Sequence, residues 1–285
     1  MIEILLLTSS ICLSSGRSIL SKKINQKDDN SFVFFALQSA IFLICLLVTL
    51  FTNLSTFFVI SPLTCLYGII YGILLISAQW LYTISLKTGS AATCSMVYSF
   101  GFIIPTIASF IFFDDKITLL KIIGLCLAVF VILLISIYKD NKQESNKFII
   151  PLLLSTLSSG GLGVLQKVQQ RSEVASEKPS FLFVAFLVAF IISLIFMLIN
   201  IKQRKKINSN QLFFASLCGF CFGSANIVNT TLAGMLPGSI LFPTQNIGVI
   251  LLVTLLGFII FKEKPKKNEI LSFFIGIASI ILLSV

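Results

Sequence analysis

The chain has 285 residues, of which 56% are apolar and only 11% are charged, and its formal net charge is +10. Soluble domains carry about a quarter charged residues, and a chain this poor in polar residues cannot cover its apolar ones in a globule. These figures exclude a soluble enzyme, a disordered chain and a nucleic-acid partner. The sequence has no histidine, the commonest general base and transition-metal ligand. We therefore expect no catalytic residue, no metal and no cofactor.

Apolar segments long enough to cross a bilayer follow one another along the whole chain. A transmembrane helix needs about 20 apolar residues, and ten segments meet this length with short polar connections between them. They are predicted at 2–21, 32–51, 63–86, 90–112, 117–138, 148–168, 181–201, 211–233, 237–261 and 269–285. The runs are apolar throughout and do not alternate in polarity, which excludes a transmembrane barrel. The predicted fold is an all-α integral membrane protein with ten transmembrane helices.

The positive charges are unevenly distributed among the connections. Of the 21 Lys and Arg residues, 15 lie in odd-numbered connections, five lie in or near even-numbered ones, and Arg17 lies within the first segment. Positively charged connections stay in the cytoplasm. The bias therefore predicts a multi-pass protein of the plasma or inner membrane with both termini outside, and contact with anionic lipid.

The seven cysteines all lie inside apolar segments. An odd, buried set does not form a disulfide framework, so we interpret these side chains as small apolar fillers. Cys218 and Cys221 form a C-x-x-C pattern, but no basic neighbour is present to lower a thiol pKa.

Short patterns in the first half of the chain recur in the second half, in the same order and at offsets of 144, 151 and 148 residues. The recurring pairs are Ser14-Ser15-Gly16 with Lys23 and Ser158-Ser159-Gly160 with Lys167; Gly68-xxx-Gly72 and Gly219-xxx-Gly223; and Asp115 with Gly124 and Glu263 with Ser272. They predict two five-helix repeats, 1–138 and 148–285, joined by a cytoplasmic linker at 139–147. Because five is odd, the second repeat enters the membrane from the opposite side, which is typical of transporters with a site near the midplane.

With these features the chain resembles the drug/metabolite transporter superfamily, specifically its EamA-type ten-helix members. The resemblance is carried by the Ser-Ser-Gly…Lys start of each half, by the small-residue stretches Gly89-Ser90-Ala91-Ala92 and Pro237-Gly238-Ser239, and by an acidic residue closing helices four and nine. It implies movement of a metabolite or drug through a central cavity lined by helices 1, 3, 4, 6, 8 and 9.

Three features depart from the family pattern. Ser15-Gly16 stands where members often have Trp-Gly, and the usual Gly-Glu pair is replaced by Asp114-Asp115 and Lys262-Glu263. Many members are drawn with cytoplasmic termini, whereas the charge bias here points outward.

Arg17 stands out as the only charge well inside an apolar segment. It shares one helix stripe with Ser10, Ser14 and Ser21, at spacings of three and four residues, which favours a wet face. Its guanidinium is either a counter-charge for a carboxylate or phosphate of the substrate or a group that extends to the lipid headgroups.

Other polar side chains within the segments are candidates for lining a cavity. Asn226, Asn229 and Thr230 share a face of one helix, where they either bind substrate or bond neighbouring helices. Pro243 precedes two amides and indicates a kink or a broken helix, with Pro105 in a similar role. Trp80 and Tyr82 are expected in the interfacial belt. The predicted substrate-binding set is Ser14, Arg17, Gln79, Tyr98, Ser158, Asn226, Asn229, Gln245 and Asn246.

Together these features predict a permease that moves a small polar metabolite or drug by alternating access, acting as a monomer or homodimer. All eleven acidic residues lie in connections or at helix ends, so no midplane carboxylate is available to exchange a proton for a cationic drug. A facilitator or exchanger is therefore favoured. The alternatives are a flippase for lipids or lipid-linked sugars and, with less support, a membrane enzyme acting on lipid-linked substrates.

Overall fold

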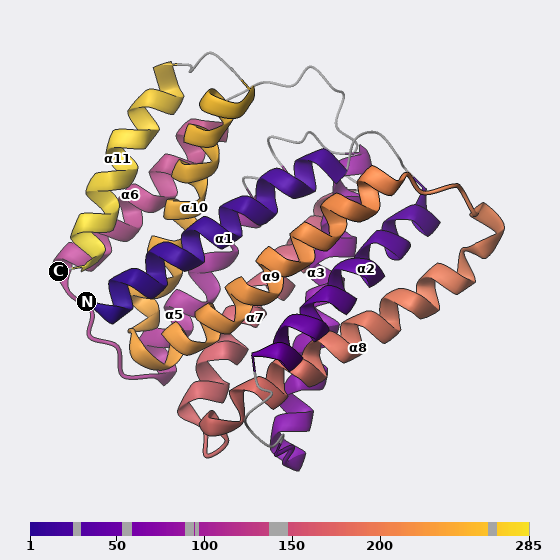
Figure 1. Ribbon diagram of the computed structural model, residues 1–285. Coiled ribbons are helices and arrows are strands. Elements are labelled where there is room, and N and C mark those ends of the chain that lie inside the picture. Colours follow the sequence, from indigo (N-terminus) through magenta and orange to yellow (C-terminus); the bar gives the residue numbers. More distant parts are fainter. Residues whose placement is uncertain are drawn as a thin grey trace. The chain divides into compact units, whose positions relative to one another are not determined.

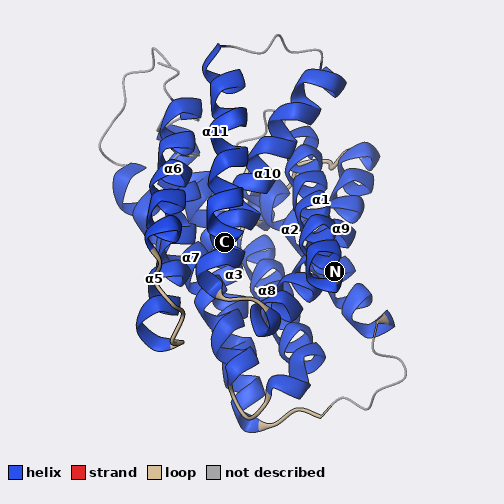
Figure 2. Ribbon diagram, turned by 90° about the vertical axis from the view of Figure 1, so that its left-hand side faces the viewer, coloured by secondary structure: helices blue, strands red, loops and turns tan. Residues whose placement is uncertain are grey.

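The computed structural model describes residues 1–24, 30–52, 59–88, 94, 97–136, 148–261 and 267–284. Within these ranges the chain forms helices and short connections, and no strand (Figure 2). The α-helices are α1 (Ile2–Ile24), α2 (Ser31–Phe51), α3 (Pro62–Thr88), α5 (Ile103–Phe112), α6 (Leu119–Ser136), α7 (Ile149–Arg171), α8 (Lys178–Ile199), α9 (Ser209–Met235), α10 (Gly238–Phe261) and α11 (Lys267–Ser284). Three 3-10 turns complete them: η1 (Phe100–Phe102), η3 (Ala175–Glu177) and η4 (Ile201–Gln203).

Each of the ten predicted segments overlaps helix in the structure, and the fourth coincides with η1 and α5. Seven helices in the described residues are long and apolar enough to cross a membrane, whereas the apolar parts at Val97–Phe112, Leu119–Leu134 and Phe273–Leu283 are shorter. The predicted stretch Gly89-Ser90-Ala91-Ala92, the linker 139–147 and the pair Lys262-Glu263 lie outside the described residues. The structure therefore shows a multi-span helical protein, with seven spans of full length.

Local chemistry explains where several helices begin. Asn30 precedes α2, and its side-chain oxygen accepts hydrogen bonds from Phe32 N at 2.9 Å and Val33 N at 3.4 Å, as an N-cap does. Proline stands in the first turn of α8, where its missing N–H costs no helical hydrogen bond. Pro243 lies inside α10, which continues through it to Phe261.

The chain divides into two compact units, and each unit combines segments from both halves of the sequence. Unit 1 consists of residues 1–76 and 165–234, and unit 2 consists of residues 77–164 and 235–285. The helices α3 and α7 each contribute residues to both units.

In unit 1, α2 packs side by side with α8 (Figure 1). The rings of Phe35 and Phe196 stack with centroids 5.1 Å apart, and Asn30 Nδ2 donates to Gln203 O at 2.8 Å. Residue numbers fall on one segment as they rise on the other, so α2 and α8 are antiparallel. They are the second helices of the two predicted repeats.

The two Gly-xxx-Gly motifs bring further helices of unit 1 into close contact. A Cβ atom at Gly68 would lie 2.7 Å from Val184 Cβ, and one at Gly72 would overlap Ala185 O, so α3 packs on α8. A Cβ atom at Gly219 would lie 2.6 Å from Ile41 O, so α9 packs on α2. The third helix of each half thus packs on the second helix of the other half. This reciprocity is expected of two repeats related by a two-fold axis.

Equivalent helices also pair in unit 2. The fifth helices of the two halves, α6 and α11, pack together (Figure 1), and Ser279 Oγ donates to Gly124 O at 2.7 Å. The fourth helices, α5 and α10, meet where α5 ends and α10 begins: a Cβ atom at Gly238 would overlap Ser109 Oγ. The packing within unit 2 therefore follows the same repeat.

Asp114 and Asp115 have different roles in the connection after α5. Asp114 has a φ of 56°, a conformation that glycine adopts without strain and aspartate tolerates. Asp115 Oδ2 accepts from Ser239 N at 3.0 Å in the first turn of α10, where a negative charge is favourable.

Replacing Asp115 by alanine is expected to lower the free energy of unfolding by about 1 kcal/mol, because the first turn of α10 loses its acceptor. Thermal unfolding of the purified protein in detergent measures this change. The comparison variant is Asp114→Gly, which removes the neighbouring charge at a positive φ and should leave the melting temperature equal or slightly higher. Equal losses in both variants would contradict the capping role.

Candidate functional site

The polar stripe of α1 faces α9 within unit 1. The Ser10 hydroxyl hydrogen-bonds Asn229 Oδ1, and Ser21 Oγ lies 3.4 Å from Cys218 Sγ. Between them, the guanidinium carbon of Arg17 lies 3.7 Å from the centroid of the Phe222 ring. The contacts descend along α9 as they ascend along α1, so the two helices are antiparallel neighbours (Figure 1). We call these side chains, together with Ser14, the α1–α9 interface.

Arg17 packs against protein in this structure. The side chain is half-buried, and at 3.7 Å its guanidinium covers the face of the Phe222 ring, a favourable cation–π contact. The helix α1 continues to Ile24, seven residues beyond Arg17, which is about 10 Å along the axis. The contact holds the charge well inside the helix and beside α9.

A buried hydrogen-bond cluster joins α3, α7 and α9 next to this interface. Gln166 Nε2 donates to Tyr71 Oη at 2.9 Å and to Thr230 Oγ1 at 3.3 Å, and Tyr71 Oη donates to Asn226 Oδ1 at 2.7 Å. All four side chains are at most 6% exposed. We call these four residues the Tyr71 cluster. Buried polar groups bonded in this way stiffen the helices that carry them.

Asn226 uses both ends of its amide within the protein. Besides accepting from Tyr71, it donates from Nδ2 to Phe222 O at 2.9 Å. Of the two roles expected for this residue, the bonding to a neighbouring helix is the one seen here. The contact also fixes the turn of α9 that carries Phe222, and so supports the ring on which Arg17 lies.

Two members of the Tyr71 cluster, Tyr71 and Gln166, were not predicted from the sequence. A phenol between Gly68 and Gly72 in the middle of an apolar span requires a buried partner, which is a signal that could have identified Tyr71. Gln166 stands close to the end of its predicted segment, where a polar side chain is unremarkable, so no comparable signal exists for it.

Lys167 corrects the statement that Arg17 is the only charge inside a span. The sequence places Lys167 at a helix end, but α7 continues to Arg171 and the Lys167 side chain is only 1% exposed. It interacts with other groups of the protein. Unit 1 therefore carries a second cation within its helices.

The nine predicted site residues fall into both units. Four of them belong to unit 1: Ser14 and Arg17 on α1, and Asn226 and Asn229 on the neighbouring α9. The other five belong to unit 2. In unit 2 the rings of Tyr98 and Tyr82 lie 4.7 Å apart, and Ser158 Oγ donates to Leu154 O of its own helix at 2.9 Å. The Tyr82 ring, expected in the interfacial belt, is thus packed on a predicted site residue.

The amides predicted for unit 2 are all half-buried. The backbone carbonyl of Gln79, not its side-chain amide, accepts from Thr83 Oγ1 at 2.9 Å within α3, and Gln245 interacts with another group of the protein. Asn246 Oδ1 is buried without a hydrogen-bond partner among the described residues. No hydrogen bond links these predicted residues to one another in the described part of unit 2.

Unsatisfied buried oxygens are concentrated in unit 2. Within the described ranges, six buried side-chain oxygens lack a partner, and all but Ser15 Oγ belong to this unit. The five are Ser109 Oγ, Ser155 Oγ, Ser239 Oγ, Thr244 Oγ1 and Asn246 Oδ1. Buried polar groups are normally bonded to protein or water, so these positions are able to accept water or a polar solute.

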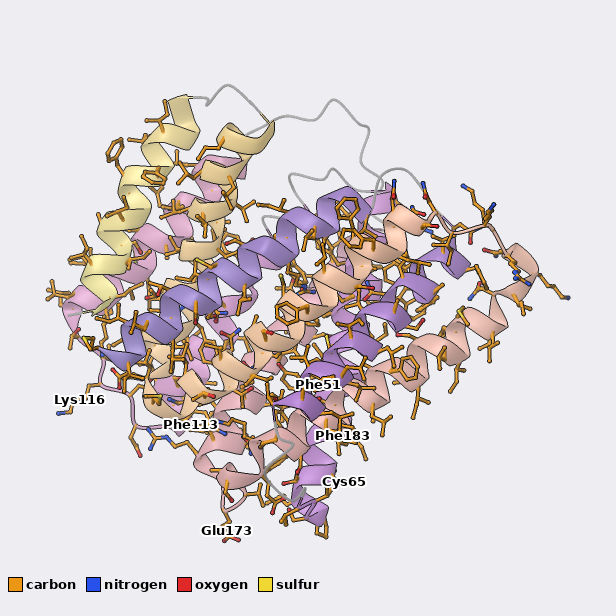
Figure 3. All side chains as sticks on the ribbon, viewed as in Figure 1. Phe51, Cys65, Phe113, Lys116, Glu173 and Phe183 are labelled. Carbon is orange, nitrogen blue, oxygen red and sulfur yellow. The ribbon has the colours of Figure 1, made fainter. Side chains whose placement is uncertain are left out.

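The described carboxylates stay away from the centres of the helices. Those whose side chains the structure describes lie in connections or in the first turn of α1: Glu3, Asp114, Asp115, Glu173 and Glu177. Figure 3 shows Glu173 and Lys116 pointing away from the helices that precede them. Glu177 accepts from Ser61 N at 2.9 Å at the start of α3. Among the described residues, no group of three metal-ligating side chains occurs.

Seven long apolar helices and a two-repeat packing pattern define a multi-span membrane protein of the transporter type. The chain matches the model of the EamA-like transporter family over residues 1–137 and 146–285, and it belongs to that family. The two matched stretches are the two halves of the sequence.

Solved structures share this fold. One crystal structure matches with a TM-score of 0.77 at 13% identity, over 98% of this chain and 95% of that chain. At this identity the likeness shows the fold alone. No curated protein sequence matches the chain.

Proposed function

We propose that the protein is a permease that moves a small polar metabolite or drug by alternating access of two inverted five-helix repeats. The observation that carries the proposal is the reciprocal packing of equivalent helices. The second helices of the two halves, α2 and α8, are antiparallel, and each third helix packs on the opposite second helix through its Gly-xxx-Gly motif. Inverted repeats of this kind allow two halves to exchange conformations.

The polar interior of both units supports a polar cargo. The α1–α9 interface places Arg17 and Asn229 inside a membrane-spanning pair of helices, and unit 2 holds buried oxygens that have no hydrogen-bond partner among the residues the structure describes. Polar groups within a membrane protein are costly and mark substrate paths. We extend the proposal to ten spans in the plasma or inner membrane, with both termini outside.

The described carboxylates favour a facilitator or an exchanger over proton-coupled antiport. None lies in the middle of a helix, so a midplane carboxyl group that exchanges a proton for a cation is absent from the described residues. Arginine stays charged at every physiological pH, so Arg17 does not supply a proton either.

Uptake into proteoliposomes tests the function. The purified protein is reconstituted and offered labelled carboxylates, amino acids, nucleosides, organic phosphates and choline, with and without the same solute trapped inside. We expect one solute class to enter down its gradient and to enter faster against trapped solute. A strict requirement for an imposed pH gradient would overturn the facilitator assignment. Movement of a labelled lipid between leaflets, without solute uptake, would replace the permease by a flippase.

A further inference from the structure

The charge of Arg17 is not balanced by any acidic side chain that the structure describes. No described carboxylate forms an ion pair with its guanidinium, which lies over the Phe222 ring. A ring face attracts a cation more weakly than a carboxylate does when both are removed from water. The site therefore favours an added negative charge.

The position of the Arg17 guanidinium over the Phe222 ring, with Cζ 3.7 Å from the ring centroid, indicates where its N–H donors can point. The N–H bonds of a guanidinium lie in its plane, so covering one face with the Phe222 ring leaves the edges available. Two parallel N–H bonds at one edge match the two oxygens of a carboxylate or phosphate. A ligand approaching the edge does not have to displace the ring.

The neighbouring side chains of the α1–α9 interface also present donors. Asn229 Oδ1 is occupied by the Ser10 hydroxyl, while Asn229 Nδ2 and the Ser14 hydroxyl have no hydrogen bond to the described residues. Both side chains are half-buried. The amide nitrogen can only donate. The interface thus offers donors from Arg17, Ser14 and Asn229, while its amide acceptor is already used.

The geometry points to a binding site for an organic anion, whose carboxylate or phosphate group is held edge-on by Arg17 and whose further acceptors meet Ser14 and Asn229. This inference rests on the proposed transport function and assigns its substrate class: a water-soluble anion rather than a cation or a neutral solute. Anionic lipid headgroups share the same chemistry, and the experiment separates the two sources.

Thermal unfolding of the full-length protein in non-ionic detergent provides the test, because a ligand that binds only the native state raises the melting temperature. The probes are inorganic phosphate and short mono- and dicarboxylates, compared at constant ionic strength with their neutral amides and with choline. We expect the anions alone to raise the melting temperature. Arg17→Gln should weaken their binding about 100-fold, because it removes a charged two-donor contact.

Two further variants keep the test decisive. Arg17→Lys retains the charge without the planar pair of donors, so the anion shift should persist but require at least about tenfold more ligand; this variant replaces Arg17→Gln if the latter does not yield folded protein. Lys178→Gln removes another cation of unit 1, which bonds Thr231 Oγ1 at 2.9 Å, and should leave the anion shift unchanged.

Three results would overturn the anion site: shifts with neutral or cationic probes only, equal anion shifts in wild type and Arg17→Gln, or shifts with phosphatidylglycerol micelles alone. Failure of the transport proposal can be distinguished from failure of the anion site. Uptake of a neutral solute that is unaffected by Arg17→Gln would leave the permease standing and remove the anion site. Anion binding without uptake of any solute would leave the anion site standing and remove the permease.

Discussion

Replacing Gly72 by valine is expected to eliminate most of the correctly folded protein, and replacing Gly219 by valine should have the same effect. A side chain at Gly72 would overlap Ala185 O, and one at Gly219 would lie 2.6 Å from Ile41 O. Backbone oxygens cannot move aside without separating the helices, and close backbone approach drives helix association in membranes. We expect each variant to lose about 3 kcal/mol or more.

Size-exclusion chromatography and thermal unfolding in detergent measure this loss. Gly16→Ala is the matched control: it is also a glycine inside a helix of unit 1, but an added Cβ atom would meet only Cys221 Sγ at 3.5 Å, an ordinary contact. It should give wild-type yield and a melting temperature close to that of wild type. Normal yields for Gly72→Val or Gly219→Val would show that the two helix pairs separate without cost, and would remove the packing basis of the repeat.

The pairing of these two glycine motifs connects the sequence to the fold. From the sequence alone, their similar spacing indicates only that one half repeats the other. The structure adds that each motif serves the opposite half, since α3 packs on α8 and α9 packs on α2. Each substitution in one motif therefore has an equivalent substitution in the other. Because the packing is reciprocal, we expect the two to lower the free energy of unfolding by similar amounts.

Helix positions were predicted well because their signal is local. A span of about 20 apolar residues is visible in the sequence itself, and α2, α9 and α10 begin and end within about two residues of the predicted limits. The prediction was weaker where tertiary context extends a helix: α7 continues to Arg171. That extension removes Lys167 from the helix end and buries it.

The candidate site was predicted in part, and the reason again lies in the distance along the chain. The stripe of Ser10, Arg17 and Ser21 follows from helical spacing, and the structure shows that it faces α9. The partner of Arg17 is about 200 residues away, and a phenylalanine among 28 in the chain carries no sign that it lies beneath a cation. Partners of this kind depend on the packing of helices and are not encoded in local periodicity.

Tyr71→Phe is expected to destabilise the protein although it removes a single oxygen atom. Tyr71 Oη accepts from Gln166 Nε2 at 2.9 Å and donates to Asn226 Oδ1 at 2.7 Å, and the side chain is 1% exposed. Its loss leaves two amides short of a partner in a buried region. We expect a cost of about 2 kcal/mol, seen as a melting temperature lowered by about 4 °C.

Tyr98→Phe is the matched control for this change. The Tyr98 ring packs on Tyr82 at 4.7 Å, and its hydroxyl forms no hydrogen bond with the described residues, so the variant should melt close to wild type. A double-mutant cycle then isolates the bond itself: Tyr71→Phe and Asn226→Ala should be coupled by more than about 0.5 kcal/mol, whereas Tyr71→Phe and Tyr98→Phe should add. If the first pair also adds, the hydrogen bond between Tyr71 and Asn226 does not tie α3 to α9.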